Sequence, residues 1–348
     1  MQNFIKAFSF FFIMLCLGIE STAHTFGIAV VDGKGKVLAN EKDSFTTEKG
    51  GMIPNEVAEH HKRVCNEVLS KALEKAKITL KEIDLISFSD SPGLAPALIV
   101  GMNFAKQISQ QKTKNTTKNI PVVGVNHCIA HLEIGRLLTK AKDPVLLYAS
   151  GANTQVIAYS GKKYRIFGET LDMGVGNFID SFARYIGLGF PGGPKIYELA
   201  LKGKNLIELP YCVKGMDVVF SGILTNLKNK YDSKNKEYST EDLAFSLQET
   251  VFAMLIETAE RAMAHCGKKE LILGGGVACN KRLQEMCQIM CKERNAKCFI
   301  PENQFLVDNA AMIAWQGILQ KKNATTNLKN IDIKPYERTD DVKVYWRK

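Results

Sequence analysis

Hydrophobic runs and alternating stretches follow one another along the chain in an order that occurs twice. The apolar run "LCLGIE" (15–20) precedes "TFGIAVVDGKGKVLAN" (25–40), and "VLLYAS" (145–150) precedes "TQVIAYSGKKYRIFGE" (154–169). Each pair predicts a buried strand, a short polar loop and a β-hairpin whose turn holds Gly and Lys. The pattern therefore indicates a duplicated strand–loop–hairpin unit.

Helical and strand patterns alternate after each copy of this unit. The periodicity predicts helices at 57–76, 98–109 and 241–266 and from Lys281 onward, and strands at 83–93, 120–125 and the start of 270–280. On the 57–76 helix one face is expected to be buried, with Val57, His61, Val64, Val68 and Leu69. This alternation argues for two α/β lobes.

Duplicated units of this kind are typical of the two-lobed actin, Hsp70 and sugar-kinase superfamily, the actin-like (ASKHA) fold, whose interlobe cleft holds nucleotide phosphates. An ordinary two-domain α/β protein is the alternative. We expect a first lobe at 14–144, a second lobe at 145–308 and a C-terminal helix and tail at 309–348. Residues 1–13 are interpreted as an extension or a mis-called start, although their apolar run resembles a secretory signal.

Composition narrows the function classes. A hydrophobic content of 45% with 24% charged residues is that of a globular protein, with no membrane span expected. The net charge of +10 favours an acidic partner, with nucleic acid as the first candidate. Nine cysteines without a disulfide-like framework predict a reducing, cytoplasmic location.

The stretch "NHCIAHLEIG" (126–135) carries the sharpest chemical signal. Asn126 is a good helix N-cap, and the four-residue spacing puts His127 and His131 on one helical face, where both can reach one metal ion. A zinc peptidase of the HExxH type would need Glu where Cys128 stands. Capping or packing is the alternative reading of the pair, and a metal site needs further ligands from elsewhere.

Three glycine-rich loops and one late carboxylate are further candidates. The loops "YASGANTQ" (148–155), "GLGFPGGPKIYELA" (187–200) and "LILGGGVACN" (271–280) follow strands or open helices, which suits binding of phosphate by backbone N–H groups. Each loop can also be interpreted as an ordinary turn, but the three loops together favour a nucleotide cleft. Asp308 precedes the apolar helix of "FLVDNAAMIAWQGI" (305–318) and is read as an N-cap, as a ligand or as both.

The whole pattern resembles one known family. "GIESTAHTFG", "NHCIAHLEIG", "YASGANTQVIAY", "GETLDMGVGNFID", "PGGPKI", "GMDVVFSGILT", "LGGGVACN", "VDNAAMIAW" and the tail "IKPYERTDDVKVYWR" are similar to the tRNA N6-threonylcarbamoyladenosine synthases of the archaeal and eukaryotic KEOPS type. The resemblance covers about residues 14 to 348. It implies transfer of a threonylcarbamoyl group from threonylcarbamoyl-AMP to N6 of the adenosine 3′ of the tRNA anticodon, with release of AMP.

The resemblance also implies site residues. The metal, iron or else zinc, would be held by His127, His131, Tyr148 and Asp308. The nucleotide or adenylate (ATP or threonylcarbamoyl-AMP) would be held by Tyr148, Ala149, Ser150, Gly151, Ala152, Asp180, Gly193, Tyr197 and Asn280. Ala152 departs from a common Gly, and Tyr197 stands where a Glu often contacts the ribose, with Glu198 one place later. His24, in the first-lobe loop, is a candidate proton shuttle or only a loop hydrogen-bonding residue.

The partners implied are the tRNA anticodon loop, a small kinase-like ATPase and a dimerising subunit. In the family the dimerising subunit docks on first-lobe helices, and the helix start at 60–63 is expected to form part of that face, while its apolar stripe packs on the sheet. Two other function classes stay open. An actin-like small-molecule kinase would use a carboxylate base and Mg²⁺ and would not need the His pair. A non-catalytic scaffold would bind ATP and partners and modify nothing.

Overall fold

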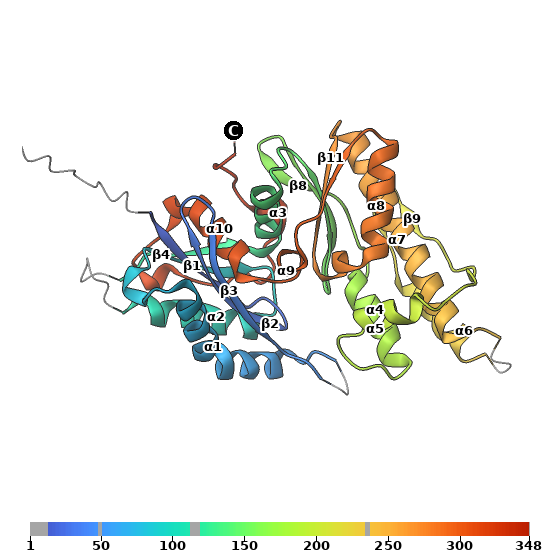
Figure 1. The fold of residues 1–348 in the computed structure, drawn as a ribbon, viewed down its shortest axis with the longest axis horizontal. Coiled ribbons are helices and arrows are strands. Elements are labelled where there is room, and N and C mark those ends of the chain that lie inside the picture. The colour runs from blue at the N-terminus through green and yellow to red at the C-terminus, as the bar shows by residue number, and fades with distance from the viewer. Residues whose placement is uncertain (1–12, 48–50, 112–118, 234–236, 348) are drawn as a thin grey trace, which may run out of the picture.

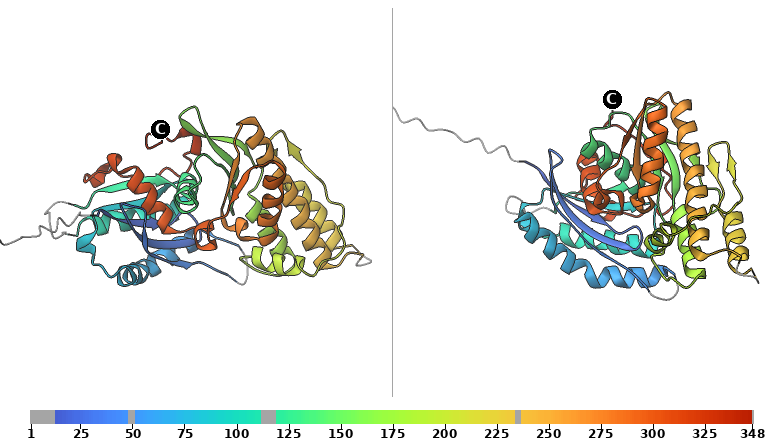
Figure 2. Two further views of the ribbon diagram at one scale, coloured as in Figure 1. Left: turned by 45° about the horizontal axis from the view of Figure 1, so that its top comes forward. Right: turned by 45° about the vertical axis from the view of Figure 1, so that its right-hand side comes forward.

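The computed structural model describes residues 13–47, 51–111, 119–233 and 237–347, which form two α/β lobes side by side (Figure 1, Figure 2). The expected extension at 1–13 lies outside the described residues except for Ile13. The first sheet contains β1 (Leu15–Glu20), β2 (Thr25–Asp32), β3 (Val37–Ser44), β4 (Leu85–Ser91) and β5 (Val122–Asn126). Its strand order is β3-β2-β1-β4-β5.

The second sheet repeats this plan. It contains β6 (Val145–Ala149), β7 (Thr154–Ser160), β8 (Lys163–Glu169), β11 (Glu270–Gly274) and β12 (Lys297–Phe299). Its order, β12-β11-β6-β7-β8, is that of the first sheet, with an antiparallel three-strand meander followed on the other side by two parallel strands. The duplication predicted from the two hairpins is therefore confirmed, and both central strands, β1 and β6, end toward the region between the lobes.

Helices cover both faces of the first sheet. Its helices are α1 (Pro54–Ala76), α2 (Ala95–Ser109), α3 (His127–Thr139) and α10 (Ala310–Leu319). The five positions expected on the buried face of α1 are all buried, because that face packs with α2 on one side of the sheet. On the other side α10 packs across β1, and a Cβ on Gly18 would lie 2.3 Å from the Ala310 carbonyl oxygen. Gly18 thus lets the start of α10 approach the central strand closely.

The second lobe carries its helices mainly on one face. They are α4 (Val175–Tyr185), α5 (Gly193–Ala200), α6 (Ser221–Tyr231), α7 (Thr240–His265) and α8 (Lys281–Glu293), with the short hairpin β9 (Val213–Lys214) and β10 (Asp217–Val218) and the single turn α9 (Asn303–Leu306). The long apolar helix α7 crosses behind β6 and β11 in this core. Among the described residues no helix is both long and apolar enough to cross a membrane.

Helix α3 joins the lobes. It follows β5 of the first sheet, yet its residues Cys128, Ile129 and Leu132 share a core cluster with Leu146 and Ile272 of the second sheet. The chain from α9 to α10 crosses back from the second lobe to the first, and it passes beside α3 (Figure 1). Residues from both lobes therefore meet at the start of α3.

Candidate functional site

The start of α3 places the two histidines. Asn126 ends β5 in an extended conformation, and its side chain accepts a hydrogen bond from the Ile129 N–H at 3.2 Å, as an N-cap does. The predicted cap is confirmed. His127 is then the first helical residue and His131 follows one turn later, with ring centroids 4.8 Å apart and both rings buried.

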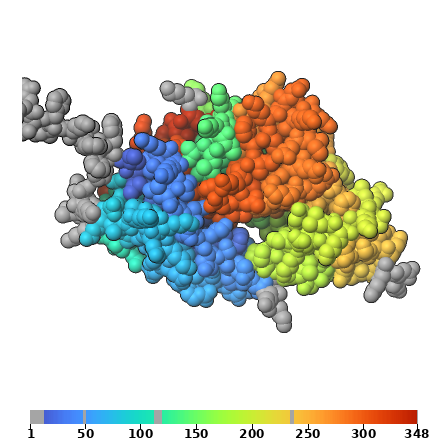
Figure 3. Space-filling view, in the orientation of Figure 1, coloured from blue at the N-terminus to red at the C-terminus, as the bar shows by residue number. Residues whose placement is uncertain are grey.

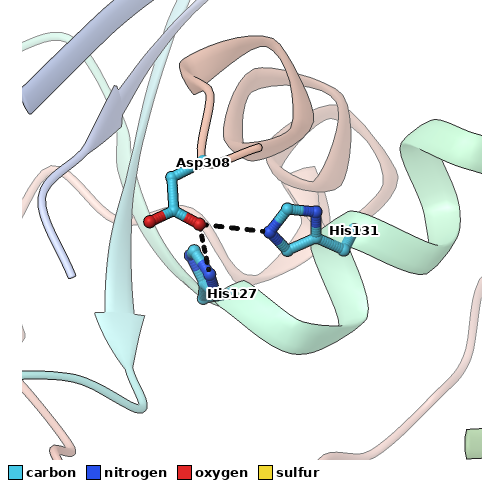
Figure 4. A group of neighbouring side chains, drawn as sticks. All are labelled: His127, His131 and Asp308. Atoms are coloured by element: carbon cyan, nitrogen blue, oxygen red, sulfur yellow. Dashed lines mark ion pairs between the residues drawn. The ribbon is translucent and has the colours of Figure 1, made fainter. Parts of the chain in front are cut away.

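Asp308 meets this pair from the segment between α9 and α10 (Figure 4). Its Oδ1 lies 3.3 Å from Nε2 of His127 and 3.5 Å from Nε2 of His131. One potential ligand atom from each of the three residues lies within 4.8 Å of the others, so the group could hold a metal ion. The reading of Asp308 as an N-cap is wrong, because Asn309 caps α10 by accepting from the Met312 N–H at 3.1 Å.

Tyr148 brings the second lobe to the same point. It lies near the end of β6, is fully buried, and its hydroxyl lies 3.0 Å from Nε2 of His127. Its ring centroid is 5.0 Å from that of His131. Burial raises the pKa of the Tyr148 phenol, so the hydroxyl carries its proton until a cation replaces it. All four residues expected as ligands therefore converge.

Two residues beside the histidines were missed by the sequence reasoning. Glu20 ends β1 with a fully buried side chain, and its Oε2 accepts from Nδ1 of His127 at 2.9 Å. The N–H and hydroxyl of Thr22 donate to the other oxygen, at 2.7 and 2.5 Å. A carboxylate that accepts from one ring nitrogen leaves the other nitrogen free to ligate a metal. The sequence feature that could have indicated this role is a Glu at the end of an otherwise apolar strand.

The charges of the cluster are strongly coupled. Burial opposes a charge on His127, but the carboxylates of Glu20 and Asp308 raise its pKa well above the usual value. Burial lowers the pKa of His131, and the neighbouring charge on His127 adds to this effect. Burial also opposes the charge on Asp308, yet its contacts with His127 hold its pKa well below the usual value.

The donor atoms fit a metal. Both ring nitrogens of His131 are buried and lack a hydrogen-bond partner within the described residues. Buried polar nitrogens are costly unless a partner satisfies them. Two imidazoles, one carboxylate and one phenol form a nitrogen and oxygen set that suits a borderline transition metal better than Mg²⁺.

The glycine loops lie around this cluster. Ser150 closes the turn after β6 by bonding Asn153, while the N–H groups of Gly151 and Ala152 make no hydrogen bond within the described part of the chain. Both residues are exposed. The turn after β11 packs directly on this loop, since a Cβ on Gly275, whose φ is +90°, would lie 2.3 Å from the Ala149 carbonyl oxygen. Two of the three predicted loops are thus in contact.

The third loop connects to Asp180 and to the first lobe. Asp180 Oδ1 accepts from the Gly192 N–H at 2.7 Å, next to Gly193, and burial raises its pKa. His24 packs edge-on against Phe190, with centroids 5.8 Å apart, so it faces the second lobe. The surface is hollowed between the blue first-lobe atoms and the yellow-green atoms of this region (Figure 3).

Two expected nucleotide residues have other contacts here. The side chain of Asn280 caps α8 by accepting from the Arg282 N–H at 2.8 Å, and its amide donates to Gln248 at 2.8 Å. Tyr197 lies half-buried on α5, and Glu198 is exposed beside it. Successive helical residues point about 100° apart, so the two side chains face different directions.

Comparison with known proteins decides the family. The family model described as tRNA N6-adenosine threonylcarbamoyltransferase matches residues 36–315. A relative of that name from Thermococcus kodakarensis is 53% identical over 334 residues, which are 96% of this chain and 100% of the relative. The chain belongs to the tRNA N6-adenosine threonylcarbamoyltransferase family. The resemblance inferred from its motifs is confirmed.

Other relatives of the tRNA N6-adenosine threonylcarbamoyltransferase family differ in the share of their own length that this chain covers. A probable member from Dictyostelium discoideum is 48% identical over 95% of this chain and 98% of its own length. A probable bifunctional tRNA threonylcarbamoyladenosine biosynthesis protein from Methanocaldococcus jannaschii is 49% identical over 96% of this chain but only 61% of its own length. That relative therefore carries a further segment.

Solved structures agree on the fold alone. Component A of (R)-2-hydroxyglutaryl-CoA dehydratase from Acidaminococcus fermentans superposes with a TM-score of 0.56 at 12% identity, covering 89% of this chain and 99% of that one. HypF from T. kodakarensis superposes with a TM-score of 0.59 at 15% identity, covering 89% of this chain and 48% of that one. The expected two-lobed actin-like class is confirmed.

Proposed function

We propose that this chain transfers the threonylcarbamoyl group of threonylcarbamoyl-AMP to N6 of the adenosine 3′ of a tRNA anticodon. The observation that carries the proposal is the convergence of His127, His131 and Asp308 in a chain of this family. The N6 amine attacks the carbamoyl carbon and loses a proton, the bond from that carbon to the phosphate oxygen breaks, and AMP leaves. This amine is a weak nucleophile, so the carbonyl needs polarising.

The resident metal would be held by His127, His131, Asp308 and Tyr148. The donor set and the unpartnered nitrogens of His131 support this assignment, and iron, or else zinc, suits such a set. When bound, the ion supplies a Lewis acid that stabilises negative charge developing on carbonyl or phosphate oxygens. Glu20 orients His127 from behind by accepting its Nδ1 hydrogen.

The adenylate would lie along the second-lobe side of the cleft. The unpaired N–H groups of Gly151 and Ala152 can bind phosphate oxygens, beside Tyr148, Ala149 and Ser150. Asp180, Gly193, Asn280 and either Tyr197 or Glu198 would hold the nucleoside. Much of the rate acceleration would come from this positioning.

His24 is proposed to move a proton at the reacting amine. It faces the second lobe at Phe190, and its charge acts on both Asp180 and Asp308, which supports a place between the adenylate and the metal ligands. A role limited to holding the first-lobe loop is the competing assignment. A pH–rate profile of His24→Gln distinguishes the two assignments. If His24 carries the proton, its replacement abolishes one of the pH-dependent limbs of the profile; if it only holds the loop, both limbs stay.

The tRNA would present a single-stranded anticodon loop, in which the base is open to attack. A net charge of +10 supports electrostatic binding, and affinity is then expected to fall steeply with added salt. The nine cysteines are all free, which agrees with a cytoplasmic location. The isolated chain is expected to bind tRNA weakly, with partners supplying much of the tRNA surface.

A small kinase-like ATPase and a dimerising subunit are the proposed partners. The groove between α1 and α2 supports the second: its volume is about 550 Å³, and its lining combines apolar residues such as Ala58, Pro96, Ile99 and Phe104 with polar ones such as Lys62 and Asn103. Ile99 is 42% exposed beside it. The expected contribution of His60 and His61 to this face is wrong, since both are buried against the first-lobe sheet, whereas Lys62 and Arg63 are exposed.

One assay separates the candidate functions. The chain is incubated with threonylcarbamoyl-AMP, tRNA and its partner subunits, and the nucleosides are analysed by mass spectrometry. A threonylcarbamoyl adenosine product supports the proposal. Phosphorylation of a small molecule without that product would favour the kinase, and ATP binding without either product would favour the scaffold. The nitrogen-rich donor set speaks against the Mg²⁺ site that a kinase needs.

A further inference from the structure

A line of three buried or half-buried side chains lies beneath the first-lobe loop, away from the metal cluster. Asp43 Oδ1 on β3 lies 2.8 Å from Nε2 of His60 on α1. Nδ1 of His60 lies 3.2 Å from Nδ1 of His61. Nε2 of His61 lies 2.9 Å from the carbonyl oxygen of Ala23. The line therefore runs from the surface at Asp43 to the loop between β1 and β2.

The hydrogen atoms of this line do not balance if both rings are neutral. The carbonyl of Ala23 only accepts, so His61 must carry hydrogen on Nε2. A carboxylate at Asp43 only accepts, so His60 must carry hydrogen on Nε2. Two neutral rings have then used both their hydrogens, and the two Nδ1 atoms would face each other as acceptors. The hydrogen bond between the two Nδ1 atoms of His60 and His61 therefore needs one additional proton.

Burial indicates where the additional proton resides. His61 is 0% exposed, and its burial, with the adjacent His60 as the next cause, lowers its pKa to about 4. The Asp43 side chain is 46% exposed, so water stabilises its carboxylate, and an imidazole binds a proton more tightly than a carboxylate does. The remaining place is Nδ1 of His60, where the ring's positive charge faces the Asp43 carboxylate.

Charged groups of the loop, of β3 and of α1 act on the line. His24, in the loop, lowers the pKa of His61, while Asp43, on β3, raises it. From α1 itself, Lys71 acts on Asp43 and on Glu41, the next acidic residue of β3. The rings of Phe26 and Phe45 cover His61 and His60, at centroid distances of 5.4 and 6.0 Å. These aromatic contacts shield the line from water on two sides.

We propose that Asp43, a doubly protonated His60 and a neutral His61 form a charged hydrogen-bond chain that positions the loop from Ser21 to His24 in the cleft. Ala23 stands between Thr22, whose hydroxyl lies 3.2 Å from Nδ1 of His127, and His24, which faces the second lobe. Holding the Ala23 carbonyl thus fixes both neighbours. These are positioning residues, and their effect on transfer rests on the proposed function.

Loss of the additional proton breaks the chain at one link. The two Nδ1 lone pairs would then repel, and either His60 or His61 must turn away from its partner. The loop position therefore depends on the protonation of a residue that touches neither metal nor substrate. Asp43→Asn removes the negative charge that lies 2.8 Å from Nε2 of His60, so the doubly protonated ring loses its ion pair.

The direct test is imidazole nitrogen NMR on the full chain labelled with ¹⁵N-histidine. The sequence has 6 histidines, and His60→Gln and His61→Gln assign the two signals. We expect His60 with both nitrogens protonated and His61 with hydrogen on Nε2 only under the conditions of the transfer assay. In Asp43→Asn, whose side chain carries no charge to face the ring, we expect a neutral His60 under the same conditions. A neutral His60 in the parent protein under those conditions would overturn the proposal.

Transfer assays test the positioning role separately. His61→Ala should lower kcat by up to about 100-fold with a small change in KM, because the loop is displaced while binding surfaces remain. His61→Gln keeps one donor and one acceptor and should recover most of that loss. His265→Gln, an exposed site on α7, is the matched control. Equal loss in the Ala and Gln variants would contradict the positioning role, whereas an inactive parent protein would contradict only the proposed function.

Discussion

The carboxylate of Asp308 lies 3.3 Å from Nε2 of His127, although Asp308 precedes α10 and His127 begins α3. The contact depends on one close backbone approach and on one helix cap. Gly18 admits the start of α10 against β1, and Asn126 fixes the first turn of α3. The cluster is therefore a product of the crossing between lobes and is not specified by any one element.

Removal of either histidine should deplete the metal without unfolding the chain. His131→Ala deletes a ring whose nitrogens have no hydrogen-bond partner within the described residues and whose contact with Asp308 is 3.5 Å long, so few native hydrogen bonds are lost. We expect metal content to fall at least severalfold by elemental analysis, with an unchanged circular dichroism spectrum. Undiminished metal in a His127→Ala, His131→Ala double variant would exclude this site.

Variants of Asp308 and Asn309 should distinguish metal ligation, assigned to Asp308, from helix capping, assigned to Asn309. Asp308→Asn should lose metal and activity and leave the cap of α10 intact, because Asn309 makes the cap. Asn309→Ala should keep the ligand and lose about 1 kcal/mol of stability. Thermal denaturation and elemental analysis of both variants form the test. Full metal content in Asp308→Asn would remove Asp308 from the ligand set.

Metal binding should release protons. The carboxylates beside His127 raise its pKa despite burial, and burial raises that of Tyr148, so both groups hold protons that a metal must displace. Affinity is therefore weak at low pH and increases as pH rises. Tyr148→Phe should release about one proton fewer per metal, measured by calorimetry in buffers of different ionisation enthalpy. An equal proton count would show that the phenol does not ligate.

The groove between α1 and α2 should bind the dimerising subunit through apolar contact. Ile99→Glu places a charge in the lining of the groove and should weaken the complex by about tenfold or more, since moving a charge out of water into an interface is costly. Ile289→Glu is the matched control, because Ile289 on α8 is 47% exposed and Ile99 is 42% exposed. Equal weakening by both variants, or by neither, in a pull-down with the purified partner would place the interface elsewhere.

Much of the fold could be predicted because local patterns determine it. The two hairpins, the buried stripe of α1 and the cap at Asn126 each follow from residues near one another in the chain. The His pair is visible for the same reason. These features need no knowledge of how the lobes pack.

Other parts of the site could not be predicted because they depend on contacts between distant segments. Glu20 at the end of β1 forms a hydrogen bond with His127 at the start of α3, and no hydrophobic periodicity predicts a contact between these two elements. Asp308 and Asn309 are both good capping residues, and only backbone geometry decides between them. His60 reads as a polar surface residue, yet Asp43 and His61 satisfy its nitrogens in the interior.

The central claim is metal-dependent threonylcarbamoyl transfer at the start of α3. The most direct measurement is nucleoside mass spectrometry of tRNA after incubation with threonylcarbamoyl-AMP and partner subunits, using the parent chain and Asp308→Asn, each metal-depleted and then reconstituted. The account predicts product with the reconstituted parent, little with the depleted parent, and none with Asp308→Asn in either state. Equal product from the depleted and reconstituted parent, or full product from Asp308→Asn, would contradict it.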